Sequence, residues 1–251
     1  MTGFFWFSFI QSKLMRQLHE IQLKILEKLL FSISLRYSQI KPDKKMENNQ
    51  FQFHLNQLTE MGLVRKENGK YLLTPKGKEY ANRIDEGENQ LKLQAKISAW
   101  IACTRIVKNK KQFLIYTRLK QPFYGCQGYL SGKVRYGENL TEAVKRELKE
   151  ETNLDCLKSK VIAIKHFRVF DKRTKELVED KFMFMCLVEN PKGELKGNKE
   201  GKFEWVDEDR LYDYVANPFE NEKGFRHQVQ LIKEFDGCIK LFEEDHYSEK
   251  F

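Results

Sequence analysis

The segment Gly132–Leu154 constrains what this chain can fold into more than any other part of the sequence. It reads GKVRYGENLTEAVKRELKEETNL, with Glu138 six positions after the first glycine and Arg146 eight positions after that. A surface helix stabilised by i,i+4 ion pairs would explain the many charges, but it requires neither the glycine nor the distant glutamate. The spacing therefore indicates a loop followed by a helix, with residues that are fixed by function.

A helix is expected to begin near Leu140. Asn139 and Glu142 have the spacing of a capping box, in which each side chain accepts a hydrogen bond from the other residue's backbone amide. Three glutamates of this helix stand at i, i+3 and i+4 and share one face within one turn. They are Glu147, Glu150 and Glu151. Their mutual repulsion predicts a bound cation.

The predicted cation is Mg²⁺ or Mn²⁺. Carboxylate oxygens are hard ligands, and no neighbouring His or Cys argues for zinc. Mg²⁺ retains several waters and binds substrate phosphates, which suits a substrate that carries a pyrophosphate. The sequence therefore predicts the attack of water on a P–O–P linkage with the help of a divalent metal.

These residues resemble the signature of the Nudix hydrolase family. The family has a glycine, a glutamate, an Arg-Glu pair and two adjacent glutamates at this spacing, and it cleaves nucleoside diphosphates linked to another group. Asn153 departs from the pattern where the family has glycine, and Ser131 replaces a glycine just before the signature. Asparagine tolerates the left-handed conformation that glycine supplies after a helix. Because the catalytic carboxylates are all present, we expect an active enzyme.

The resemblance assigns roles to the charged residues of the signature. It implies that Glu147, Glu150 and Glu151 bind metal or act as the base. Glu138 would be a secondary metal ligand or an orienting group. Arg146 matches the arginine that orients a catalytic carboxylate.

In many family members the general base is a glutamate on a later loop. Glu200 lies shortly before a predicted strand that contains a tryptophan, and it is the candidate here. Three other acidic residues are alternatives for the same role: Glu179, Asp180 and Glu204.

Basic residues flank the predicted metal site and are expected to bind substrate phosphates. They are Arg118, Lys120, Lys133 and Arg135, with Gly132 beside them at the start of the signature. Three aromatic residues either stack on a base or pack in the fold, with packing favoured: Tyr124, Tyr129 and Trp205. The sequence does not distinguish between five substrate classes: ADP-ribose, dinucleotides, nucleotide sugars, oxidised nucleotides and capped RNA ends. ADP-ribose is placed first only because substrates of this type are common in the family.

The resemblance implies an α/β/α sandwich around a mixed sheet over residues 95–251, which places this domain in the α/β or α+β class. The alternation of apolar residues agrees with it. The predicted strands are Lys96–Thr104, Phe113–Arg118, Val161–Asp171, Val178–Val188 and Phe203–Val206. A helix is predicted over Phe225–Phe235.

Residues 15–85 predict a separate small domain that contains helices and one hairpin. The predicted helices are Arg16–Phe31, Tyr37–Ile40, Asn49–Met61 and Lys76–Ile84. The hairpin consists of Leu63–Arg65 and Lys70–Leu73 around Asn68-Gly69. This order, and the segment FHLNQLTEMGLVRKENGKYLLTPKG, resemble a winged helix-turn-helix domain. Residues 86–94 are expected to form a linker.

The small domain is expected to bind DNA or to serve protein contacts and domain packing. The exposed face of the helix Asn49–Met61 is expected to offer Gln50, Gln52 and His54 as base-reading side chains. Lys66 and Lys70 on the wing would contact phosphates. Over residues 1–90 there are 14 Lys and Arg against 10 Asp and Glu, a net charge of +4 out of +9 for the whole chain. This mild excess leaves the two alternatives about equal.

The apolar segment 1–14 fits neither domain, so we expect translation to start at Met15. Its run GFFWFSFI is far shorter than the roughly 20 residues that span a bilayer. It has neither a basic leader nor a small-residue cleavage site, so no secretory signal and no membrane anchor are expected. The five cysteines form no C-x-x-C pair, which predicts a reducing, cytoplasmic location.

Two functions are compatible with the sequence. In the first, the protein is a metal-dependent pyrophosphohydrolase that acts on a nucleotide, and the winged helix regulates or targets it. In the second, it is a transcription regulator that senses a nucleotide through the Nudix domain, as some relatives with both domain types do. Regulators without catalysis tend to lose signature glutamates, and this chain keeps all four, which favours the enzyme. Because Nudix domains often dimerise, a homodimer is also considered.

Overall fold

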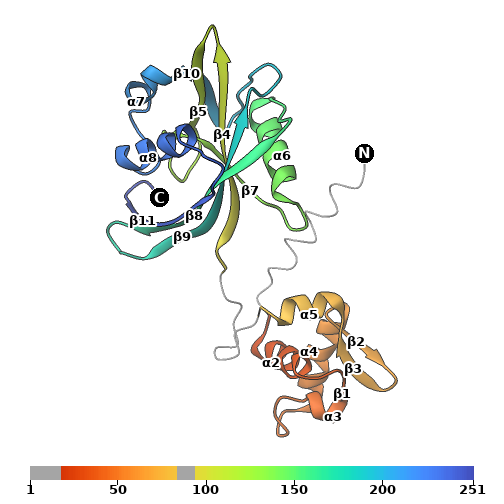
Figure 1. Ribbon diagram of the computed structural model, residues 1–251. Helices are drawn as coiled ribbons and strands as arrows, with labels where there is room; N and C mark the ends of the chain where they lie inside the picture. The colour runs from red at the N-terminus through yellow and green to blue at the C-terminus, as the bar shows by residue number, and fades with distance from the viewer. Residues whose placement is uncertain (1–17, 84–93) are drawn as a thin grey trace. The chain divides into compact units, whose positions relative to one another are not determined.

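The computed structural model describes residues 18–83 and 94–251. The chain divides into two compact units, Met1–Leu93 and Gln94–Phe251 (Figure 1). The predicted extension 1–14 lies outside the described residues, and so does the predicted linker 86–94 apart from Gln94. No helix within the described ranges is long and apolar enough to cross a membrane.

The first unit consists of a small helical core with a three-stranded sheet. Its helices are α2 (Glu20–Leu30), α3 (Tyr37–Ile40), α4 (Asn48–Glu60) and α5 (Pro75–Ala81). Its strands are β1 (Leu35–Arg36), β2 (Val64–Glu67) and β3 (Lys70–Leu73), in the order β1-β3-β2. The predicted order of helices and hairpin is therefore confirmed, and β1 is an addition that the sequence did not indicate.

Local sequence explains where these elements begin and turn. Asn68 and Gly69 both have positive φ angles, 49° and 74°, as the tight β2–β3 turn requires. The Thr74 hydroxyl accepts a hydrogen bond from the Gly77 amide at 2.9 Å and caps α5, with Pro75 in the first turn. One cluster of apolar side chains, including Ile25, Phe51 and other buried residues of α2 and α4, holds the unit together.

The second unit is built on an eight-stranded mixed sheet. Its long strands are β4 (Lys96–Val107), β5 (Lys110–Arg118), β8 (Ser159–Asp171), β9 (Leu177–Glu189), β10 (Gly201–Asp207) and β11 (Lys240–Ser248). They lie in the order β10-β5-β4-β9-β8-β11, with β4 parallel to β9 and β8 parallel to β11. The predicted strands are confirmed, whereas β11 was not predicted because charged residues interrupt its apolar alternation.

The sheet opens between β4 and β5. These strands pair only from Thr104 to Val107 on β4 and from Lys110 to Phe113 on β5. Beyond this point the short strand β7 (Leu130–Lys133) pairs with β4, and β6 (Gln127–Gly128) pairs with β5. The segment that leads into the signature is therefore held in the opening by both arms of the sheet.

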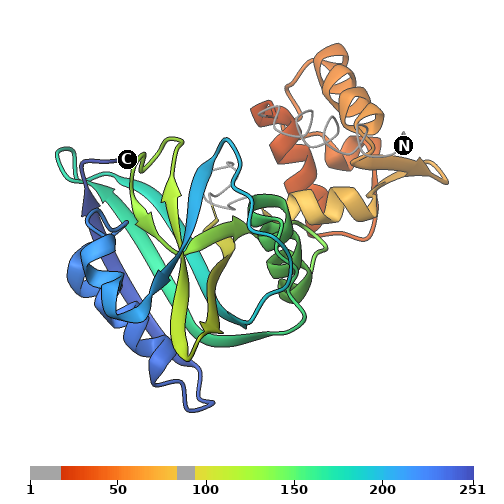
Figure 2. The ribbon, with the colours of Figure 1, turned by 90° about the horizontal axis from the view of Figure 1, so that it is seen from above.

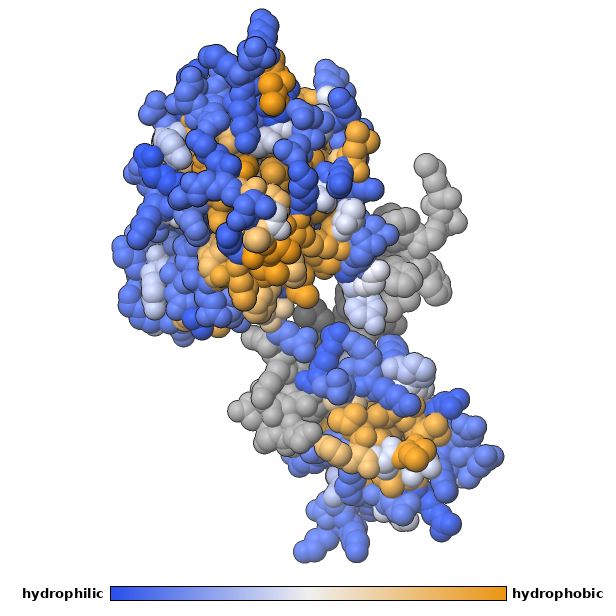
Figure 3. Space-filling view, viewed as in Figure 1, coloured by the Kyte–Doolittle hydropathy of each residue, from blue (hydrophilic) through white to orange (hydrophobic). Residues whose placement is uncertain are grey.

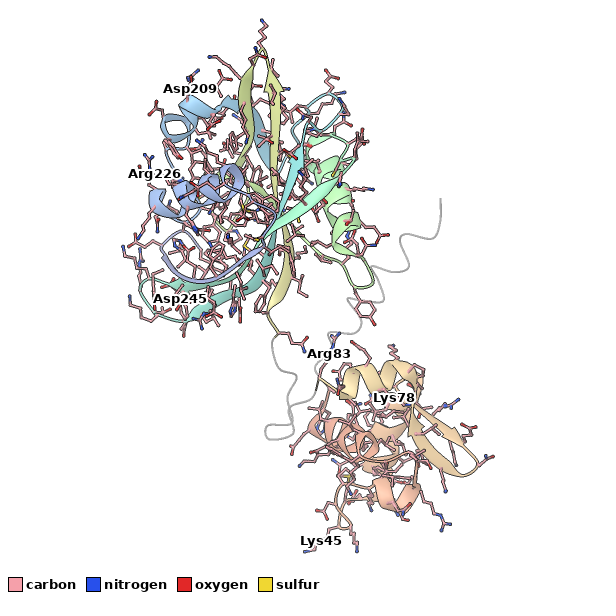
Figure 4. All side chains as sticks on the ribbon, viewed as in Figure 1. Lys45, Lys78, Arg83, Asp209, Arg226 and Asp245 are labelled. Carbon is pink, nitrogen blue, oxygen red and sulfur yellow. The ribbon has the colours of Figure 1, made fainter. Side chains whose placement is uncertain are left out.

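Helices cover both faces of this sheet, as Figure 2 shows from above. The helix α6 (Leu140–Thr152) packs through Val144 and Leu148 on one face. The helix α8 (Glu222–Lys233) packs through Phe225 and Val229 on the other, and Arg226 points outward from it (Figure 4). A 3₁₀ turn (Glu208–Arg210) and α7 (Leu211–Tyr214) lie between β10 and α8 in the chain. The α/β/α arrangement is confirmed.

Apolar surface is visible on both units in the space-filling view (Figure 3). Among the described residues, large exposed apolar side chains include Phe53 on α4, which is 58% exposed, and Ile97 on β4, which is 52% exposed. Single exposed apolar residues are ordinary on protein surfaces, so these two alone do not define an interface.

Gly77 provides a test of how the first unit packs. A Cβ atom on Gly77 would lie 1.9 Å from the backbone carbonyl oxygen of Leu63, which cannot swing aside as a flexible side chain can. We expect Gly77→Ala to destabilise this unit by about 1–3 kcal/mol. The faster hydrogen exchange of amides in α2 and α5 would measure the loss. The matched variant Lys78→Ala, at an exposed position of the same helix, should leave exchange unchanged. Equal exchange in both variants would contradict the packing described.

Candidate active site

The helix α6 begins and ends as its sequence predicts. The Asn139 side chain accepts from the Glu142 amide, and the Glu142 carboxylate accepts from the Asn139 amide, both at 3.0 Å. At the other end, Asn153 has φ of 60° and ψ of 10°, the left-handed conformation that replaces the usual glycine. The capping box and the role of Asn153 are therefore confirmed, and they fix the position of the charged face between them.

Arg146 is the centre of the charged face. Its guanidinium donates two hydrogen bonds to the Glu138 carboxylate, at 2.6 and 2.8 Å, and one to Glu147 at 2.5 Å. It also donates to Glu150 at 3.3 Å and to the backbone carbonyl of Lys133 at 3.0 Å. One planar group thus holds carboxylates from the loop and from the helix in fixed positions.

Glu138 is the carboxylate that this arrangement affects most. The hydrogen bonds from Arg146 lower the pKa of Glu138 to about 2, and the backbone amide of Arg135, which donates to it at 2.9 Å, lowers it further. The same pairing raises the pKa of the Arg146 guanidinium. Glu138 is therefore ionised at every physiological pH.

Gly132 allows Glu147 to lie against the β7 backbone. A Cβ atom at position 132 would lie 2.0 Å from the Glu147 Cδ and 2.3 Å from its Oε2. The space that a side chain would occupy here is filled by the Glu147 carboxylate. This close approach is the physical reason for the glycine that opens the signature.

Glu151 and Glu200 are linked through Asn198, a residue that the sequence did not single out. The Asn198 amide nitrogen donates to the Glu151 carboxylate at 2.6 Å, and its oxygen accepts from the Glu200 backbone amide at 2.7 Å. The Glu200 carboxylate itself pairs with the Lys120 ammonium. A turn that precedes β10 thus places Glu200 next to the helix glutamates, and no sequence spacing could show this.

The other candidates for the general base form pairs with groups outside the signature. Glu179 pairs with Lys96 at 3.2 Å, and Asp180 pairs with the His166 ring at 2.8 Å. Glu204 accepts a hydrogen bond from the Tyr214 hydroxyl. Of these three carboxylates only Glu179 lines the same cavity as Glu200, and it does so together with residues of β4 and β9.

The predicted phosphate-binding residues surround the same cavity. Arg118, Lys120, Lys133 and Arg135 all line it. The Arg118 Nε donates to the Pro122 carbonyl at 2.6 Å, which orients the guanidinium, and Arg135 lies 3.3 Å from the Glu150 carboxylate. Burial lowers the pKa of Lys120, and the neighbouring Arg118 charge lowers it further.

The cavity has a volume of about 600 Å³, which suits a nucleotide-sized ligand. Its lining includes Glu147, Glu151 and Glu200 on the side of α6. Aromatic residues of the lining are Trp100, Tyr129, Phe167, Phe219 and Phe225, and the charged residues Glu179, Lys181 and Glu220 line the cavity as well. Of the aromatic residues considered from the sequence, Tyr129 packs in the core with 2% exposure, and Trp205 lies under Arg105 at 4.2 Å. Tyr124 is exposed.

A divalent cation fits the oxygen-rich donor set on α6. Within residues 18–83 and 94–251 no three Asp, Glu, His or Cys side chains already converge as a metal cage, because Arg146 stands among the glutamates. However, Glu147 fills the space above Gly132, and both it and Glu151 face the cavity. Carboxylates open to a cavity suit a hard cation that keeps several waters and binds phosphates. Which glutamates bind it stays a prediction.

The winged-helix residues divide into exposed and buried ones. Gln50, Lys66 and Lys70 are exposed, and Gln52 is half-buried. His54 is 7% exposed and stacks on His19 with 4.4 Å between ring centroids. The expectation that His54 lies on the exposed face of its helix is therefore wrong, because at the i+3 position from Phe51 it faces the core of the unit.

The pairing of Glu138 with Arg146 has a consequence for pH dependence. The pKa of Glu138 in the folded protein lies below the ordinary value of 4.5. The pair therefore stabilises the folded state above pH 4.5, and this stabilisation is lost as the pH falls towards 2. We expect a ¹³C NMR titration with EDTA to show the Glu138 carboxyl titrating near 2. In Arg146→Gln the midpoint should rise towards 4.5. A midpoint near 4.5 in the wild type would contradict the geometry.

Known proteins resemble parts of this chain. The ADP-ribose pyrophosphatase of Methanocaldococcus jannaschii is 35% identical over 78 residues, 31% of this chain and 46% of that protein. The chain thus aligns with about half the length of this curated relative.

Two solved structures are similar to the chain in part of their fold. The first is the NUDIX domain of Shewanella oneidensis NrtR complexed with ADP ribose, with a TM-score of 0.48 and 13% sequence identity, covering 64% of this chain and 98% of that chain. The second is a MutT protein from Bacillus halodurans, with a TM-score of 0.48 and 23% sequence identity, covering 62% of this chain and 92% of that chain. Both TM-scores are below 0.5, so neither similarity bears on what this chain binds.

Family models cover both units. A model described as a winged helix-turn-helix matches residues 15–92. A model described as a NUDIX domain matches residues 98–228, which is more than half of the chain and includes the whole signature. The chain therefore belongs to the Nudix family and carries a winged helix-turn-helix domain before its Nudix domain.

Proposed function

We propose that this protein is a divalent-metal-dependent pyrophosphohydrolase that cleaves a nucleoside diphosphate linked to another group. The observation that carries the proposal is the cavity in which Glu147, Glu151 and Glu200 face basic side chains. Carboxylates suit a cation and an attacking water, and the basic groups suit phosphates. The retention of every signature glutamate supports catalysis over simple ligand sensing.

ADP-ribose is the first substrate to test. The curated relative that is 35% identical over part of the chain is named an ADP-ribose pyrophosphatase. Dinucleotides and nucleotide sugars share the nucleoside diphosphate and remain alternatives. The proposed location is the cytoplasm, where these nucleotides and reduced cysteines coexist.

Residues of the signature would hold the metal. Glu147, Glu150 and Glu151 are the proposed ligands, with Glu138 as a further ligand or as the group that keeps Arg146 in place. Mg²⁺ or Mn²⁺, when bound there, would neutralise phosphate oxygens, acidify the attacking water and stabilise the leaving phosphate. Arg146 would keep Glu147 oriented through the 2.5 Å hydrogen bond while ligands exchange.

Glu200 is proposed to remove the proton from the attacking water. The bridge through Asn198 places its backbone beside Glu151. In the present structure its carboxylate pairs with the Lys120 ammonium. When a phosphate enters, the Lys120 ammonium has a second anion to bind, and Glu200 becomes free to accept a proton.

The enzyme proposal predicts a clear effect of Glu151→Gln. We expect products in a panel of ADP-ribose, dinucleotides and nucleotide sugars with Mg²⁺ or Mn²⁺, read by mass spectrometry. The substitution should reduce turnover at least about 100-fold, the scale on which loss of a proton-transfer or charge-stabilising group acts.

Glu142→Gln is the matched control for that experiment. It makes the same chemical change on the same helix, and glutamine can still complete the capping box, so activity should stay within about twofold of the wild type. If Glu151→Gln retains full phosphate-releasing activity, the hydrolase proposal fails.

A second proposed function is DNA binding by the winged-helix domain, which the family match over residues 15–92 favours. Gln50, Lys66 and Lys70 are exposed on the helix and wing that would meet DNA. The helix α4 itself carries no Lys or Arg, so phosphate contacts would come from the wing and neighbouring loops.

Selection of duplexes from a random pool by the full chain, with and without ADP-ribose, tests this second function. We expect the selection to enrich one sequence. The affinity of the protein for that duplex should fall several-fold in the double variant Lys66→Ala/Lys70→Ala, and it should also fall as the salt concentration rises. The same pair of changes should leave turnover unaffected. If no duplex binds more tightly than random DNA, the domain serves another purpose.

A further inference from the structure

The cavity is lined by residues from both faces of the sheet. Tyr116 and Leu130 belong to the apolar cluster under α6, whereas Trp100 and Phe225 belong to the cluster under α8, and all four line the cavity. The cavity therefore passes through the opening between β4 and β5. A ligand in it can contact the α6 glutamates at one end and α8 at the other.

Gln228 is an unusual residue at the α8 end. It is 6% exposed, it lies on the helix face that carries Phe225, Val229 and Ile232, and it lines the cavity. The amide makes no hydrogen bond to any part of the chain that the structure describes, although the neighbouring side chains of Arg226 and Gln230 do. Neither amide atom is fully buried, so the amide reaches the cavity and is available to a ligand there.

The surroundings of Gln228 suit a flat ring. Phe225 lies one turn before it on α8, and Phe167 and Met183 line the cavity from β8 and β9. Aromatic and thioether side chains bind planar rings through their faces and edges. The walls thus provide apolar contact, and Gln228 provides a donor and an acceptor side by side.

A glycine at this end makes room for the Glu220 side chain, which also lines the cavity. Gly224 and Gln228 stand four residues apart on α8 and share one side of the helix. A Cβ atom on Gly224 would lie 2.6 Å from the Glu220 Oε2. The Glu220 Oε1 pairs with the buried Lys165, which also lies 2.7 Å from Glu244, whereas the Glu220 Oε2 has no hydrogen-bond partner among the described residues. Gln228 is therefore the neutral polar group at this end that can both donate and accept.

We propose that the α8 end of the cavity is the nucleobase subsite and that the Gln228 amide reads the base, with adenine preferred. A glutamine amide pairs with adenine by accepting from its exocyclic amino group and donating to the adjacent ring nitrogen. This inference rests on the proposed function, since it places the base of the same nucleoside diphosphate whose phosphates lie at the α6 end.

Binding without turnover tests the subsite. The full chain, in EDTA, is titrated calorimetrically with ADP, GDP and ribose 5-phosphate. We expect Gln228→Leu to weaken ADP binding about 10-fold or more, as loss of a bidentate contact does, and to leave ribose 5-phosphate binding within twofold. The control Gln230→Leu, at an exposed position of the same helix, should change neither.

Gln228→Glu separates a reading role from a structural one. A carboxylate only accepts hydrogen bonds, so it matches the two adjacent N–H donors of guanine and loses the pairing with adenine. We expect this variant to reverse the preference of ADP over GDP, which a distorted cavity would not do.

The proposal is overturned if wild type fails to bind ADP, if Gln228→Leu binds ADP as wild type does, or if the Gln228 variants weaken all three ligands equally. Failure of the hydrolase test with the Gln228 results intact would leave a nucleotide-binding domain without catalysis. Turnover that is insensitive to both Gln228 variants would leave the hydrolase and remove the subsite.

Discussion

The guanidinium of Arg146 is the interaction on which the candidate site depends. Five carboxylate or carbonyl oxygens accept hydrogen bonds from it, so the loop that carries Glu138, the end of β7 and the helix α6 are joined at one point. Without this cation, the glutamates of one helical turn would repel each other and turn towards solvent. A fixed arginine is also compatible with a bound metal, because it holds the carboxylates from one side and leaves the cavity side open.

The opening of the sheet is the second constraint. Since β4 and β5 pair over only a few residues, β6 and β7 enter between them and carry Gly132 to within contact of Glu147. The same opening lets one cavity reach both helices. The proposed phosphate chemistry at α6 and the proposed base recognition at α8 would then take place at two ends of one cavity.

Much of the site could be predicted because its signals are local. The capping box at Asn139, the turn residue Asn153 and the spacing of the signature glutamates all act within one loop and helix. His54 was misplaced although its i+3 spacing from Phe51 puts it on the apolar face of α4. The stacking on His19, at the start of α2, is what only the tertiary structure shows. Asn198 and Gln228 were missed because a polar residue in a turn or on an apolar face carries no motif of its own.

The sequence by itself therefore determined the family, the two domain types and the helix with its charged face, since caps, turns and periodicity are encoded by neighbouring residues. Only the tertiary structure decided which distant groups meet. It brings Glu200 to Glu151 through Asn198, pairs Glu200 with Lys120, and places Gln228 in the same cavity as the signature glutamates. The physical reason is that these contacts join segments separated by tens of residues, whose proximity depends on strand order and helix packing rather than on local propensity.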